Sequence, residues 1–67
     1  MSRAITWERS PDRLVWVARV PGTRTVLTVT RLGLDRWLPA VLDGPHGPVC
    51  RTRMAAQAEA EKLGGQP

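Results

Sequence analysis

The side chains that could take part in catalysis or metal binding are few in this chain. Cys50 is the only cysteine and His46 the only histidine among its 67 residues. A structural zinc site needs four such ligands, and a general base needs a partner that orients it, so neither residue predicts a metal or catalytic site. No carboxylates are spaced as an acid–base pair, and no Ser-His-Asp or Cys-His arrangement is visible. The sequence therefore predicts a non-enzymatic protein with no cofactor and no small-molecule substrate.

Arginine is the residue type with the most binding potential. Ten Lys and Arg residues against six Asp and Glu give a formal net charge of +4, and Lys62 is the only lysine. Arginine suits bidentate contacts with phosphate better than lysine does. An excess of arginine beside abundant Ala, Gly and Pro is also typical of GC-rich coding, as in actinobacteria and their phages. Composition alone therefore leaves a nucleic-acid partner open.

Three apolar, β-branched runs must position these side chains, over residues 13–20, 24–32 and 36–42. Each run is closed by a turn signal, and Pro21-Gly22 has the pattern of a type II turn. Pro39 has no N–H group to donate, which predicts that the third run lies at a sheet edge or is bulged. Residues 4–8 also alternate and allow a further, leading strand.

A helix is predicted to follow the strands. Thr52 is a good N-cap, Ala and Glu dominate as far as residue 63, and Gly64-Gly65 is a stop signal. We therefore predict an α+β fold in which a three-stranded antiparallel sheet, or a four-stranded one with the leading strand, packs against one C-terminal helix. The single domain spans residues 13–63, after an N-terminal segment at 1–12 and before a frayed tail at 64–67.

Alternation along the strands predicts which side chains form the core. Trp16 and Trp37 hold similar places in the first and third runs and lie on otherwise apolar faces. Aromatic side chains on a sheet can also stack nucleobases, which is the alternative role for these tryptophans. The predicted core consists of Trp16, Ala18, Leu27, Val29, Trp37, Val41, Ala56, Ala60 and Leu63.

The opposite sheet face combines cationic and aliphatic side chains. Three interpretations fit it: solubilising charges, a β-ribbon that contacts duplex DNA in the major groove, or a face that binds protein. Protein binding comes first, because +4 is modest for a dedicated nucleic-acid binder. A short chain without disulfides often gains stability by self-association, so we expect a homodimer or a complex with another protein. The predicted DNA contacts are Arg13, Arg19, Arg24 and Arg36, and the predicted interface residues are Val15, Val17, Leu38 and Leu42.

Part of this pattern resembles known small modules. Trp16-x-Ala18, two further strands, Cys50-Arg51-Thr52 and then Ala56 are similar to the β-β-β-α modules of the AP2-like and integrase arm-binding type. The resemblance covers residues 13–63 and implies DNA contact through the exposed sheet face. Cys50 stands where those modules carry an aromatic residue. The twin-tryptophan meander and Ala-rich helix also resemble small actinobacterial phage proteins, for which a role is generally not assigned. A phage-encoded modulator of a host protein is one form that the expected protein interaction could take.

The sequence also carries expectations about location. No segment approaches the ~20 apolar residues that a membrane span requires. The first nine residues include a charge but no apolar stretch of the kind that a signal peptide has. We therefore expect a cytoplasmic protein without a membrane partner.

Overall fold

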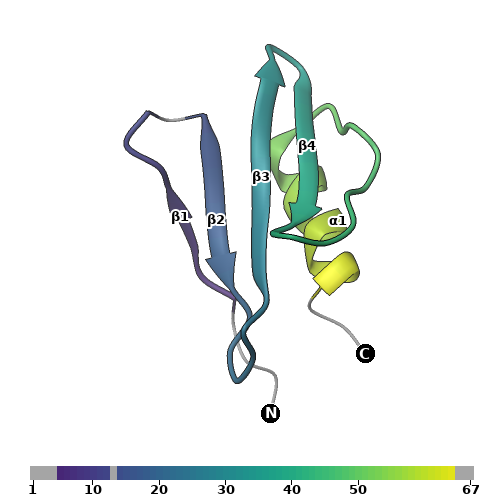
Figure 1. Cartoon of the computed structure of the whole chain (residues 1–67). Coiled ribbons are helices and arrows are strands. Elements are labelled where there is room, and N and C mark those ends of the chain that lie inside the picture. Colours follow the sequence, from purple (N-terminus) through teal and green to yellow (C-terminus); the bar gives the residue numbers. More distant parts are fainter. Residues whose placement is uncertain (1–4, 13, 65–67) are drawn as a thin grey trace.

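The computed structural model describes residues 5–12 and 14–64, and these form four strands and one helix (Figure 1). The sheet has the order β1-β2-β3-β4 with every neighbouring pair antiparallel, and α1 packs on one face, over β3 and β4. The α+β prediction is confirmed, and the leading strand forms. The elements are β1 (Trp7–Arg9), β2 (Val15–Arg19), β3 (Val26–Gly33), β4 (Arg36–Val41) and α1 (Arg53–Gly64).

The strand register decides which side chains face α1. Residues paired across antiparallel strands project to the same side of the sheet. Ala18 pairs with Trp7 on one side and with Leu27 on the other, and Leu27 pairs in turn with Val41. The neighbouring row across the strands is Arg9, Trp16, Val29 and Pro39. Both rows lie on the helix side, as the alternation of the sequence predicts.

The fully buried core is small and centred on β3. Around it lie half-buried apolar side chains, including Trp16, Trp37 and Val41. Leu63 is also half-buried, near Gly47 in the segment that precedes the helix. Trp16 stays half-exposed because the backbone of α1 packs on β3 and β4, and α1 reaches β1 and β2 through side chains alone. The Trp7 indole N–H donates to Glu61 at 3.1 Å, and Arg53 lies over the Trp16 ring. The buried apolar residues are Ala18, Leu27, Val29, Ala56 and Ala60, together with Pro39.

The Pro21-Gly22 turn and the Thr52 cap form as their residue types predict, whereas Gly64, predicted as part of the stop signal, is the last residue of α1. Gly22 has a φ of 78°, the left-handed value that a type II turn requires after Pro21. At the start of α1, the Thr52 hydroxyl accepts a hydrogen bond from the Ala55 N–H at 3.1 Å. That bond satisfies one of the backbone donors that a helix N-terminus leaves unpaired.

The outer edge of β4 is closed by the segment at residues 45–50. Trp37 and Cys50 exchange two backbone hydrogen bonds of 2.8 Å, and Gly47 donates to the carbonyl of Pro39 at 2.9 Å. Pro39 is tolerated because it lies in this last strand, where a missing N–H donor disrupts no further strand pair. The other outer strand, β1, has three residues and exposes the charged Glu8 and Arg9, features that discourage pairing with another chain.

Gly64 lets α1 approach the sheet closely. A Cβ atom there would lie 2.7 Å from Leu27 Cδ2 and 2.9 Å from side-chain carbons of both Thr25 and Val41. Leu27 is fully buried, so its side chain can move aside only by displacing other core residues. Gly64→Ala should therefore destabilise the protein by about 1–3 kcal/mol through overpacking, although alanine favours helix formation.

The measurement is urea unfolding followed by circular dichroism, and Gly33→Ala is the matched control. A Cβ atom at Gly33 would come no closer than 3.8 Å to the Arg36 side chain, which is an ordinary contact. We expect the control to unfold near the wild-type midpoint. Equal midpoints for the wild type and Gly64→Ala would contradict the close approach of α1.

Candidate interaction surfaces

The face of the sheet opposite α1 is covered by no other element in the described part of the chain (Figure 1). Val17 pairs with Thr28, which pairs with Ala40, and in the next row Thr30 pairs with both Val15 and Leu38. These side chains alternate with those that face the helix, so they share the opposite side, and all of them are half-buried. We call the surface formed by Val15, Val17, Thr28, Thr30, Leu38 and Ala40 the open face.

Three of the four predicted interface residues meet on this surface. Val15 and Leu38 flank Thr30 from either side, and Val17 lies one row further along. Leu42 follows the last residue of β4 and is 57% exposed. Its N–H donates to the carbonyl of Val26 at 2.8 Å, which places it at the opposite end of β4 from Arg36. Leu42 therefore lies at the margin of the open face.

The predicted DNA-contacting arginines lie at different ends of the sheet. Arg19 ends β2 and pairs with Val26, and Arg24 is exposed in the β2–β3 turn. Arg36 begins β4 and pairs with Gly33 near the β3–β4 turn, at the other end. Arg13 lies outside the described residues. The structure thus brings Arg19 and Arg24 to one end but does not bring Arg36 to them.

A different set of arginines contacts the tryptophans on the helix side. The guanidinium carbon of Arg53 lies 4.4 Å from the centre of the Trp16 ring, and that of Arg9 lies 5.8 Å from the same ring. Arg31 lies 5.6 Å from the Trp37 ring. Such cation–π contacts contribute about 0.5–1 kcal/mol each at exposed sites. The arginines cover the ring surface that the helix leaves open.

These contacts follow from cross-strand pairing, which the sequence does not reveal directly. Arg9 pairs with Trp16 and Arg31 pairs with Trp37, so each arginine side chain leaves the sheet next to the tryptophan that it contacts. Arg53 approaches Trp16 from the first residue of α1. A nucleobase stacking on either ring would have to displace an arginine, which weakens the case for a base-stacking role of the tryptophans.

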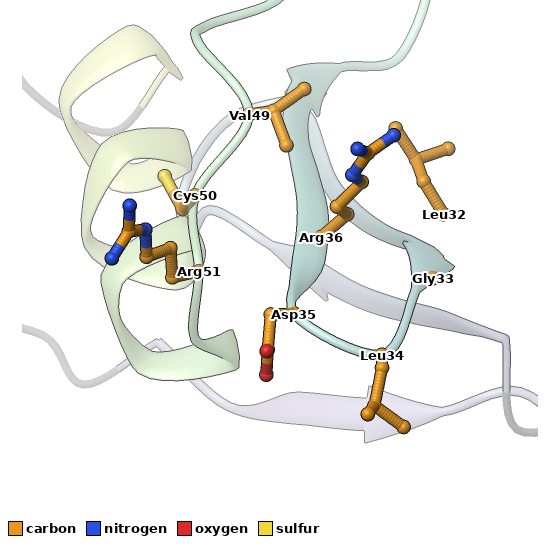
Figure 2. A pocket seen from close by; sticks show the side chains of 8 residues that line it. All are labelled: Leu32, Gly33, Leu34, Asp35, Arg36, Val49, Cys50 and Arg51. Carbon is orange, nitrogen blue, oxygen red and sulfur yellow. The ribbon is translucent and has the colours of Figure 1, made fainter.

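A shallow groove of about 670 Å³ opens between the β3–β4 turn and the segment before α1 (Figure 2). Exposed Leu32, Leu34 and Val49 line it, together with two guanidinium groups and one carboxylate. Leu34 is 82% exposed at the turn. The full lining is Leu32, Gly33, Leu34, Asp35, Arg36, Val49, Cys50 and Arg51.

Cys50 contributes to the groove wall without the properties of a nucleophile. Figure 2 shows its sulfur turned toward α1, and the thiol lies 3.4 Å from the carbonyl oxygen of Pro48, which accepts its hydrogen bond. Burial, and then the charge of Glu59, raise the pKa of the Cys50 thiol. A raised pKa lowers the fraction of the reactive thiolate at neutral pH. His46, the other candidate in the sequence, is exposed in the 45–50 segment.

Neither a metal centre nor a membrane span is found in the described part of the chain. Across residues 5–12 and 14–64, no group of three or more His, Cys, Asp or Glu side chains could hold a metal ion. No helix there is long and apolar enough to cross a membrane.

Comparisons with protein-family models, curated proteins and solved structures found no match for this chain. The resemblances to arm-binding modules and to phage proteins thus stay predictions from sequence.

The raised pKa of Cys50 predicts slow alkylation. At pH 8 the folded protein should react with iodoacetamide more slowly than the same protein in urea, because unfolding removes the burial that raises the thiol pKa. Mass spectrometry of quenched samples gives both rates, and Cys50→Ala controls for labelling elsewhere. If the folded protein reacts as fast as the unfolded one, the fold does not raise the pKa of this thiol, and a faster reaction of the folded protein would mean that the nearby arginines activate it.

Proposed function

We propose that this protein is a non-enzymatic interaction module that binds through the open face, first of all to a second copy of itself. The supporting observation is that Val15, Val17 and Leu38 lie together on a sheet face that no described element covers. Burying apolar surface is worth about 25 cal/mol per Å². A second open face, packed about 10 Å away as in a β-sandwich, would exclude water from these side chains.

The distribution of charge on this face suits such an interface. Across β2, β3 and β4 the two central rows carry valine, threonine, leucine and alanine, and Glu8 continues the row of Val17 on the outermost strand, β1. Arg19 and Arg36 lie at opposite ends of the sheet. Protein interfaces are depleted of charge at their centre and carry polar groups at the rim. Two copies related by a two-fold axis would bury the uncharged centre and keep the charges at the margin.

Both edges of the sheet are poor sites for adding a strand from a second copy, which favours a dimer in which two sheet faces pack together. The outer side of β4 is already hydrogen-bonded to residues 45–50, and β1 is short and charged. Few free backbone N–H and C=O groups therefore remain at the edges for pairing with a strand of another copy. The described part of the chain buries only five apolar residues together with Pro39, and so small a core leaves a single copy marginally stable, which favours association. By its resemblance to small phage proteins, the dimer would act in the cytoplasm on a host protein.

Val17→Lys should abolish this dimer, because the side chain lies on the open face beside Thr28, and each copy would have to bury a lysine in the interface. Sedimentation velocity at about 100 µM protein should show a dimer for the wild type, given a micromolar Kd, and a monomer for the variant. Leu34→Lys is the matched control, since Leu34 lies at the β3–β4 turn and is 82% exposed. A monomeric wild type would rule out self-association through this face.

Duplex DNA is the alternative partner, and its test is separate. If the sheet binds DNA, log K should fall with log salt by about 0.9 for each phosphate contact, and Arg19→Ala should remove one contact. Arg19 is exposed, so the substitution should leave the fold intact. Fluorescence anisotropy with labelled duplex at two salt concentrations measures both slopes. Absence of binding at low salt, or an unchanged slope in the variant, would exclude Arg19 as a DNA contact.

A further inference from the structure

Exposed apolar side chains gather at one end of the molecule. The β1–β2 and β3–β4 connections lie at the same end of the sheet, which we call the hairpin end (Figure 1). Cys50 pairs with Trp37 there, so the segment before α1 and the first turn of the helix come to the same place. Five of the six large apolar residues that the described chain exposes belong to this end: Leu14, Leu32, Leu34, Val49 and Met54.

Positive charge gathers at the same end. Five exposed arginines lie there, and the described acidic residues near them are Asp12 and Asp35, in the two connections, and Glu8, next to Arg9 in β1. The carboxylate of Asp12 accepts hydrogen bonds from the Ser10 hydroxyl and, at 3.0 Å, from the Leu14 N–H. The one ion pair among the described residues joins Lys62 and Glu59, away from this end. The arginines are Arg9, Arg31, Arg36, Arg51 and Arg53.

We propose that the hairpin end binds the surface of an anionic lipid bilayer. Leu34 and its exposed apolar neighbours would enter the boundary between headgroups and acyl chains, while the surrounding guanidinium groups bind lipid phosphates. A basic residue near an anionic membrane surface contributes about 1 kcal/mol, so several together give measurable binding. Arg36 and Arg51 line the groove of Figure 2 together with Leu34 and Val49, so cationic groups for phosphate and apolar groups for acyl chains border one site.

The shape of the hairpin end favours lipid over a folded partner. Its apolar side chains project from separate segments, with Leu34 82% and Met54 74% exposed, and do not line one deep pocket. A folded protein would need a matching cavity for each projection, whereas a fluid bilayer interface adapts to them all. Nucleic acid would use the arginines but would gain little from exposed leucine and methionine. Leu34, Val49 and Met54 lie outside the open face, so this inference is independent of self-association.

The test is flotation of the protein with vesicles of phosphatidylcholine and phosphatidylserine in equal parts, compared with vesicles of phosphatidylcholine alone. We expect binding to the anionic vesicles only. Leu34→Ser should weaken it roughly tenfold, as expected for loss of one buried leucine. Arg51→Gln should weaken it about fivefold, as expected for loss of one cation near the surface.

Matched controls lie at the opposite end of the sheet. Leu42→Ser changes a leucine that is 57% exposed, and Arg24→Gln changes an exposed arginine in the β2–β3 turn. Both should bind anionic vesicles as the wild type does. If Leu34→Ser fails to fold, Leu34→Trp replaces it and should strengthen binding, because tryptophan favours the membrane interface.

Three results would overturn the proposal. The first is no flotation of the wild type with anionic vesicles. The second is an equal loss of binding in Leu42→Ser and Leu34→Ser, which would mean that the hairpin end is not the site. The third result combines two measurements. Arg51→Gln weakens binding to single-stranded or duplex DNA while Leu34→Ser does not, and Leu34→Ser also leaves vesicle binding unchanged. In that case the arginines bind nucleic acid, and the exposed apolar side chains contribute to binding neither DNA nor vesicles.

Discussion

The close contact between α1 and β3 determines most of this structure. Ala56, Ala60 and Gly64 recur every fourth residue and form a stripe of small residues along the helix, where they meet the buried Leu27 and Val29. Small side chains bring the helix axis close to the sheet, and a helix held so close over two strands reaches β1 and β2 only through long side chains such as Glu61 and Arg53. The half-exposure of Trp16, and the arginines that lie over its ring, follow from this limited coverage.

Much of the fold could be predicted because local patterns decide it. The alternation of Trp16 and Ala18 with Val15 and Val17 assigns the two sheet faces, and Thr52 marks the start of α1. The leading strand is also visible as alternation, although it forms at Trp7–Arg9, one residue past the predicted end, and residues 5 and 6 lie outside it. The burial of the tryptophans is harder to predict, because it depends on how far α1 extends over the sheet, and no local pattern encodes that distance.

The candidate surfaces depend on contacts between distant residues, and so they were only partly visible in the sequence. The aliphatic part of the open face follows from alternation, so Val15, Val17 and Leu38 could be grouped in advance. The arginines could not be grouped in this way, because their neighbours depend on register and topology. Arg53 contacts Trp16 across 37 positions of sequence, and Arg36 is separated from Arg19 by the length of the sheet.

Residues 45–50 have two roles: they cover the outer edge of β4, and they bring residues of the pre-helix segment to the hairpin end. The two hydrogen bonds between Trp37 and Cys50 close the outer edge of β4, and they also fix where the chain enters α1. Because Trp37 lies next to the β3–β4 turn, this pairing holds Arg51 across the groove from Leu34. A segment that discourages pairing with other strands thereby assembles a cationic and apolar surface from residues far apart in the chain. Weakening those two hydrogen bonds would release a strand edge and disperse that surface together.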